Sequence, residues 1–132
     1  LTARCEVFYT PHSRPYAEAV KRCNLYADAG ADCVFVPGLA GRDVIRSFVR
    51  DANAPVNIVT ETAETRLSVA ELAELGVKRI STGGSLARAC FGLLERSASE
   101  IAETGQFEYL DHAITDPEID SFFRNGGPAK PR

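Results

Sequence analysis

The stretch at residues 29–39, AGADCVFVPGL, decides the fold of this chain. It opens on small residues and a glycine of the kind that end a helix, continues as a short apolar run, and stops at Pro-Gly. The same order returns at residues 75–84, LGVKRISTGG, where a short strand-like run again follows a helix-ending glycine. The repetition predicts a parallel α/β architecture.

The rest of the sequence continues this alternation of strands and helices. Hydrophobic periodicity predicts strands at residues 1–8, 33–36, 55–60 and 77–82, and helices at residues 15–29, 41–52, 68–75, 85–104 and 116–124. Gly30 is suited to end the first helix in the left-handed conformation. Ser68 and Glu71 match a capping box, and Asp116 is expected to cap the last helix. The apolar stripe of the long helix consists of Leu86, Cys90, Leu93, Leu94 and Ile101.

The number of these units bears on the domain organisation. A closed (β/α)8 barrel has eight strand–helix units and about 250 residues, whereas four units leave two open sheet edges. We therefore expect one domain over residues 1–124, built as the second half of a TIM barrel with C-terminal helices, and a flexible tail at residues 125–132. Because the sequence starts inside a strand, we expect it to be part of a longer enzyme or a truncated relative of one.

Composition and charge narrow the classes of function. A net charge of −3 and a pI near 5.4 provide no basic field, so nucleic-acid binding is disfavoured. No apolar run approaches the roughly 20 residues that span a bilayer, and no leader-like segment precedes the first strand. The sequence thus predicts a cytoplasmic protein without a membrane partner.

The cysteines and histidines carry no recognisable site. The four cysteines lie far apart without zinc spacing, and we expect all of them to be buried free thiols: Cys5, Cys23, Cys33 and Cys90. His12 and His112 belong to no local arrangement of nucleophile, histidine and carboxylate. Nucleophilic catalysis by a local motif is therefore not supported.

Four segments in order resemble one enzyme family. They are TARCE at residues 2–6, AGADCVFVPGL at 29–39, PVNIV at 55–59 and SVAELAELGVKRISTGGSLARA at 68–89. Together they resemble the last four strands of the isocitrate lyase and phosphoenolpyruvate mutase family. The resemblance implies a (β/α)8 barrel and a bound Mg2+. It also implies cleavage or formation of a C–C or P–C bond next to a 2-oxo acid through a metal-stabilised enolate, in a homo-oligomer.

The resemblance assigns a substrate-binding role to Arg4 and Glu6. Arg4 resembles the family arginine that holds the carboxylate or phosphonate of the substrate, and a planar guanidinium suits this task because it donates two parallel hydrogen bonds. The alternative is that Arg4 merely pairs with Glu6. Glu6 is expected to orient its neighbours rather than to react.

Two further sites are candidates for binding. Asn57 resembles a polar position near the family's substrate pocket, although an asparagine at a strand end also commonly satisfies loop backbone. Gly83, Gly84 and Ser85 open the long helix, where free amides and the helix dipole favour an anion. Close packing of the turn is the alternative explanation for the two glycines.

The chain also departs from the family pattern. Several lyases carry a glutamate where this sequence reads Val36-Pro37-Gly38, which disfavours the usual lyase substrates and favours another small oxo acid. In the family, the aspartate and glutamate ligands of Mg2+ and the acid–base loop come from earlier strands. We therefore expect the isolated chain neither to hold Mg2+ tightly nor to catalyse.

Two alternatives from other classes remain open. One is a non-catalytic four-unit α/β module that dimerises edge to edge into a barrel and binds a small anion. The other is a Rossmann-like nucleotide-binding protein, which needs a glycine-rich turn after the first strand. Residues 7–11 contain no glycine, so the sequence disfavours this second alternative.

Overall fold

The computed structural model describes residues 1–124 and divides the chain into two compact units, Leu1–Arg88 and Ala89–Arg132. The single domain predicted for residues 1–124 stays a prediction, and the predicted flexible tail at residues 125–132 lies outside the described residues.

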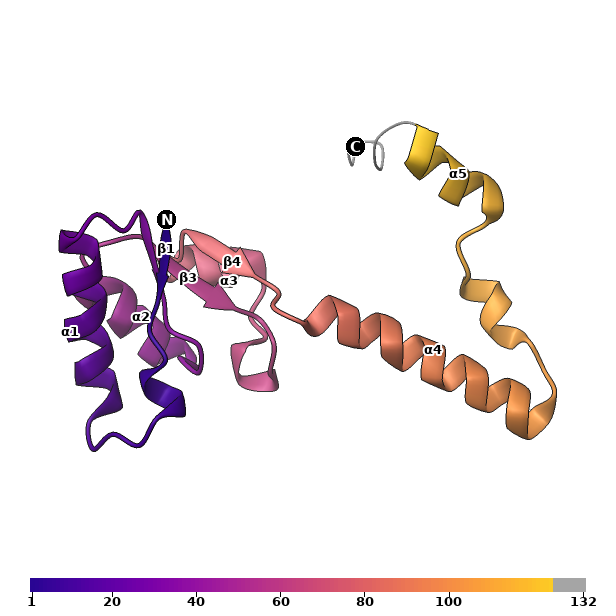
Figure 1. Cartoon of the computed structure of the whole chain (residues 1–132), viewed down its shortest axis with the longest axis horizontal. Helices are drawn as coiled ribbons and strands as arrows, with labels where there is room; N and C mark the ends of the chain where they lie inside the picture. Colours follow the sequence, from indigo (N-terminus) through magenta and orange to yellow (C-terminus); the bar gives the residue numbers. More distant parts are fainter. Residues whose placement is uncertain (125–132) are drawn as a thin grey trace. The chain divides into compact units, whose positions relative to one another are not determined.

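The first unit alternates strands and helices along the chain (Figure 1). Its elements are β1 (Thr2–Arg4), α1 (Pro15–Asp28), β2 (Cys33–Phe35), α2 (Arg42–Asp51), β3 (Val56–Val59), α3 (Val69–Glu74), β4 (Arg79–Ser81) and the start of α4 (Ser85–Thr104). Short 3-10 helices, η1 (Val7–Tyr9) and η2 (Ala63–Thr65), follow β1 and β3. The predicted order of elements is confirmed, but the strands are shorter than predicted. Residues 7–8 of the first predicted strand belong to η1, and β4 begins at Arg79 rather than at residue 77.

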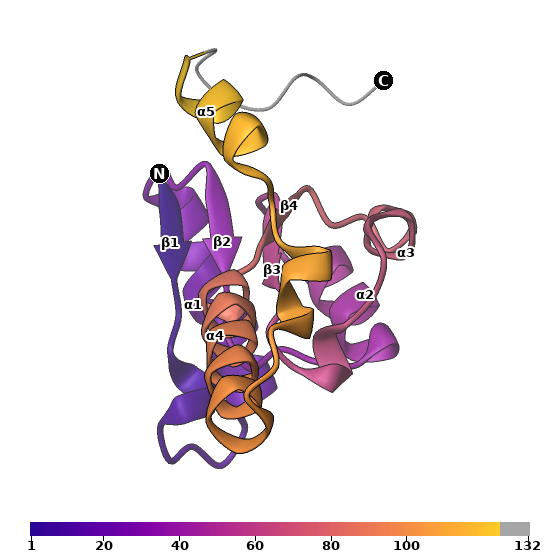
Figure 2. The same cartoon turned by 90° about the vertical axis from the view of Figure 1, so that its right-hand side faces the viewer.

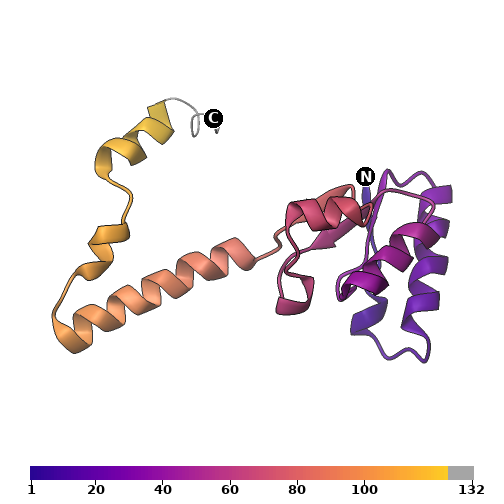
Figure 3. The same cartoon turned by 180° about the vertical axis from the view of Figure 1, so that it is seen from behind.

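The four strands form one parallel sheet in the order β1-β2-β3-β4. Figure 2 shows β1 and β2 side by side with the same direction, and Figure 1 and Figure 3 show α1 and α2 on one side of the strands. A doubly wound sheet reverses its strand order at a switch point, whereas this sheet progresses in one direction. The structure therefore excludes the Rossmann-like alternative for this unit.

The hydrophobic core lies between the helices and one face of the sheet. Strand residues Val34, Val56 and Ile58 pack there against buried residues of the three helices, which include Ala19, Cys23, Ile45, Phe48 and Leu72. The ring of Tyr16 meets Phe48 edge-on, with 6.2 Å between ring centroids. This packing leaves the alternate strand residues on the opposite face of the sheet.

Local signals define the ends of the helices in the first unit. Ser68 caps α3 as predicted, since its Oγ accepts from Glu71 N and its own N–H donates to Glu71 Oε2. Gly30 follows α1 with φ of +97°, as predicted for a left-handed stop.

The second unit is helical in its described part. It contains most of α4, then η3 (Glu108–His112) and α5 (Asp116–Arg124). The predicted long helix is confirmed, but none of its residues is buried, and the exposed positions include Leu86, Leu93, Leu94 and Ile101. Cys90 on this helix is exposed, so the prediction that all four cysteines are buried is wrong there.

The cap of α5 also differs from the prediction. Asp116 is the first residue of the helix, and Thr115 before it takes the capping position. Thr115 donates from its N–H and its Oγ1 to Glu118 Oε2, at 2.9 and 2.7 Å. The Glu118 side chain thus reaches back to the residue before the helix, as the glutamate of a capping box does. Among residues 1–124, no helix combines the length and the apolar character needed to cross a membrane.

The hydrogen bond from Tyr16 to Asp51 gives the stability a dependence on alkaline pH. Burial and this 2.7 Å bond raise the pKa of Tyr16 to about 12. Because the folded pKa lies above the unfolded value of about 10, the stabilisation is complete below pH 10 and is lost as the pH rises toward 12. We expect the difference in free energy of unfolding between the wild type and Tyr16→Phe, measured in urea, to shrink over this range. A difference that is constant from pH 8 to 12 would contradict the assignment.

Candidate functional site

The carboxyl ends of the parallel strands form the candidate site. β1 ends at Arg4, β2 at Phe35, β3 at Val59 and β4 at Ser81, so the loops that follow them meet at one edge of the sheet. A cavity of about 310 Å³ opens among these loops, and it is lined by Tyr9, Gly38, Ala40, Val59, Glu61, Thr62 and Thr65. Parallel α/β proteins bind ligands at this edge.

Arg4 and Glu6 come together at the end of β1. The Nε of Arg4 donates to Glu6 Oε1, and the guanidinium carbon of Arg4 lies 5.2 Å from the centre of the Phe35 ring. The parallel register pairs Arg4 with Phe35, which places the ring beneath the guanidinium. Although Arg4 pairs with Glu6, 54% of its side chain remains open to solvent.

Asn57 lies elsewhere in the sheet, fully buried on β3. Its Oδ1 accepts from Arg79 Nη1 at 2.9 Å, and its Nδ2 donates to Ser81 Oγ at 3.0 Å. The amide thus contacts side chains of β4 rather than loop backbone. Phe35 lies between Asn57 and Arg4 in the register of the sheet.

Three neighbours of the predicted residues were not predicted from the sequence: Phe35, Arg79 and Ser81. The alternation of Arg79 and Ser81 along β4 is a signal for a shared face, but it becomes informative only when the pairing of β3 with β4 is known. Their partner is Asn57, which lies 22 residues before Arg79.

The predicted anion site at the start of α4 holds a carboxylate of this chain. The N–H of Gly84 donates to Glu61 Oε1 at 3.2 Å, and Ser85 Oγ donates to the carbonyl oxygen of Thr82 at 2.7 Å. Glu61 therefore occupies the position where free amides favour negative charge. The binding of a substrate anion by Gly83, Gly84 and Ser85 stays a prediction.

Residues 36–39, where the family glutamate is missing, form a tight turn after β2. Leu39 N donates to the carbonyl oxygen of Val36 at 3.3 Å, and Gly38 adopts φ of +84°. Proline at the second position and a left-handed glycine at the third are the features of a type II turn. Val36 itself is buried, so this turn presents backbone and no acid to the site.

The described residues do not fit a Mg2+ ion. Within residues 1–124, no three side chains of histidine, cysteine, aspartate or glutamate are grouped as metal ligands. The open face of the sheet instead carries the cations Arg4 and Arg79. Cys23 offers no thiolate, because burial raises the pKa of its thiol to about 12.

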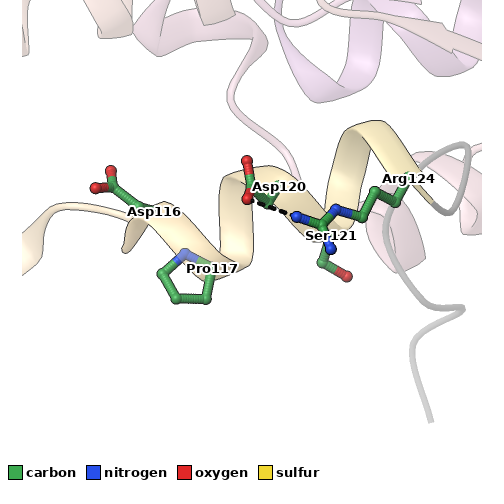
Figure 4. Close-up of a pocket in the computed structure, with 5 residues that line it drawn as sticks. All are labelled: Asp116, Pro117, Asp120, Ser121 and Arg124. Atoms are coloured by element: carbon green, nitrogen blue, oxygen red, sulfur yellow. Dashed lines mark hydrogen bonds and ion pairs between the residues drawn. The ribbon is translucent and has the colours of Figure 1, made fainter.

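A second cavity, of about 400 Å³, lies along α5 (Figure 4). Its lining consists of Asp116, Pro117, Asp120, Ser121 and Arg124, and Arg124 Nη2 lies 3.1 Å from Asp120 Oδ2. Binding sites usually draw convergent groups from several elements, whereas all these side chains belong to one short helix. We therefore keep the carboxyl edge of the sheet as the candidate site.

A family profile and several curated proteins match this sequence. The family profile of phosphoenolpyruvate phosphomutase matches residues 1–102. The 2-methylisocitrate lyase of Aeropyrum pernix is 33% identical over 107 residues, which cover 79% of this chain and 35% of that protein. The chain spans only about a third of the length of the curated relatives that it matches.

Solved structures share the fold. A protein of Burkholderia cenocepacia J2315, provisionally named a lyase/mutase, superposes with a TM-score of 0.85 and 41% identity over 94% of this chain and 44% of its own. Oxaloacetate acetylhydrolase in complex with oxalate superposes with a TM-score of 0.76 over 96% of this chain and 46% of its own. At 17% identity, this second likeness concerns the fold alone.

Proposed function

The chain belongs to the phosphoenolpyruvate phosphomutase family, within the isocitrate lyase/phosphoenolpyruvate mutase superfamily, and on this premise we propose that it supplies the carboxylate-binding side of an active site. The substrate is a small 2-oxo acid or a related carboxylate. The reaction is the cleavage or formation of a C–C bond, or of a P–C bond, next to the oxo group. The four strand–helix units of this chain form half of an eight-unit barrel.

The position of Arg4 carries this proposal. Arg4 ends a strand at the edge where parallel α/β proteins bind ligands, over the Phe35 ring and beside Glu6. A guanidinium there can donate parallel hydrogen bonds to a carboxylate and stabilise negative charge that develops on an enolate. Glu6 orients this guanidinium through its bond to Nε.

Members of this superfamily generally depend on Mg2+, but the described residues offer no ligand set for it. We accordingly assign substrate binding to residues 1–88, and no described residue is assigned proton transfer or bond cleavage. The absence of the family glutamate after β2 supports a substrate other than those of the usual lyases. A homo-oligomeric state and a cytoplasmic location remain predictions.

Calorimetric titration of oxalate into the 132-residue chain tests the role of Arg4. We expect binding without added Mg2+, and an affinity that is about 10- to 100-fold lower in Arg4→Gln, because hydrogen bonds to charged groups contribute about 1.5–3 kcal/mol. Arg46→Gln is the matched control, since Arg46 lies on α2 and pairs with Asp43 instead.

Two results would contradict this proposal. Equal oxalate affinity of Arg4→Gln and the wild type would remove Arg4 from the site. Tight binding that requires Mg2+ would show that this chain holds the metal after all. Circular dichroism of each variant establishes that the fold is retained.

A further inference from the structure

One row of side chains crosses the face of the sheet opposite the helices. The register pairs Arg4 with Phe35, Phe35 with Asn57, and Asn57 with Arg79. Paired residues of parallel strands point to the same face. The contacts agree, since Arg4 lies over Phe35 and Arg79 bonds to Asn57. The two ends of this row are therefore both cationic.

Among the residues that the structure describes, no ion pair involves Arg79. No carboxylate therefore compensates its charge there. Its guanidinium has five N–H donors, and the hydrogen bond to Asn57 uses one of them. The residue is exposed. An arginine in this condition retains several donors for an anion.

Asn57 determines where that guanidinium lies. Its side chain is fully buried, and a buried amide requires hydrogen bonds at both ends. Ser81 satisfies the nitrogen and Arg79 satisfies the oxygen. The bond to the oxygen holds the Arg79 side chain across the face of the sheet instead of letting it extend into solvent.

We propose that Arg79 is a second anion-binding residue, positioned by Asn57, and that the row from Arg4 to Arg79 selects small dicarboxylates over monocarboxylates. This inference rests on the proposed role of Arg4. Three strand spacings separate the two arginines, or about 14 Å between their Cα atoms, a span that two arginine side chains and a short diacid can bridge. The Phe35 side chain lies next to Arg4 in this row and holds the Arg4 guanidinium over its ring.

The test compares succinate with butyrate, two acids of equal chain length, by NMR titration of the arginine Nε–Hε signals in the full chain. We expect the wild type to bind succinate at least tenfold more tightly than butyrate. Arg79→Gln should lower the succinate affinity about tenfold and change the butyrate affinity less than twofold. Arg46→Gln, on the outer helix α2, should leave both affinities unchanged.

A second measurement tests the positioning role of Asn57. In Asn57→Ser, the Arg79 Nε–Hε signal should move toward the position of a solvent-exposed arginine and the preference for succinate should fall, while the Arg4 signal stays in place. An unchanged Arg79 signal would overturn this role. If that variant fails to fold, Arg79→Gln alone decides the proposal.

The outcomes separate the two proposals. If Arg4→Gln weakens both acids and Arg79→Gln changes neither, the second anion-binding residue is wrong and the proposed function stands. If Arg4→Gln changes neither acid, the proposed function fails, and this inference fails with it. Equal affinity of the wild type for succinate and butyrate overturns the selection of dicarboxylates.

Discussion

Replacing Phe48 by alanine is expected to lower the free energy of unfolding by about 3–5 kcal/mol. Phe48 is fully buried in the core beneath the sheet and meets Tyr16 edge-on. Its truncation removes apolar contact area and leaves a cavity that the surrounding helices and strands can fill only in part. Urea denaturation followed by circular dichroism measures the change.

Two variants of the same helix serve as controls for Phe48→Ala. Phe48→Leu keeps most of the volume and should cost clearly less. Val44→Ala removes an apolar side chain that is 41% exposed and should cost well under 1 kcal/mol. A loss in Phe48→Ala no greater than that in Val44→Ala would refute the position of Phe48 in the core.

The second large effect is expected at Gly76, where Gly76→Ala should cost about 2–4 kcal/mol. Gly76 follows α3 with φ of +88°, and a Cβ atom there would lie 2.9 Å from Val49 Cγ1. The left-handed conformation costs a residue with a Cβ about 1–2 kcal/mol, and the displacement of Val49, which packs against the core, adds to this. The same denaturation experiment reports the sum.

Gly30→Ala is the matched control because it separates these two costs. Gly30 has φ of +97°, but a Cβ atom there would meet nothing within 4 Å. Its substitution should therefore show the backbone cost alone, about 1–2 kcal/mol. Equal losses in both variants would show that the contact with Val49 contributes nothing.

The packing of the core affects the site because successive residues of a strand point to opposite faces of the sheet. Val34, Val56 and Ile58 pack against the helices, which sends Phe35 and Asn57 to the opposite face. A shift of one residue in any strand would exchange the faces. The packing of the helices thus determines which side chains accompany Arg4.

The sequence alone predicted the order of the elements, because the signals for it are local. The capping box of Ser68 and Glu71 spans four residues, and Gly30 ends α1 within one turn. Local signals also misled where two caps competed, since Asp116 was predicted to cap α5 and Thr115 does so with Glu118.

Burial was harder to predict than secondary structure. Periodicity identified the apolar stripe of α4, and the helix forms over the predicted residues. Its stripe is nevertheless exposed, as is Cys90 within it. Periodicity reports which side chains share a face of a helix, but it does not report what covers that face.

The sequence alone determined the alternation of strands and helices and the position of Arg4 at a strand end. These features depend on caps, glycines and hydrophobic periods, which act over a few neighbouring residues. Only the tertiary structure joined Arg79 to Asn57, across 22 residues, and set Phe35 beneath Arg4. Those contacts depend on strand register. Register depends on which strand residues pack against the helices on the far face of the sheet, and this packing joins segments that are distant in the sequence.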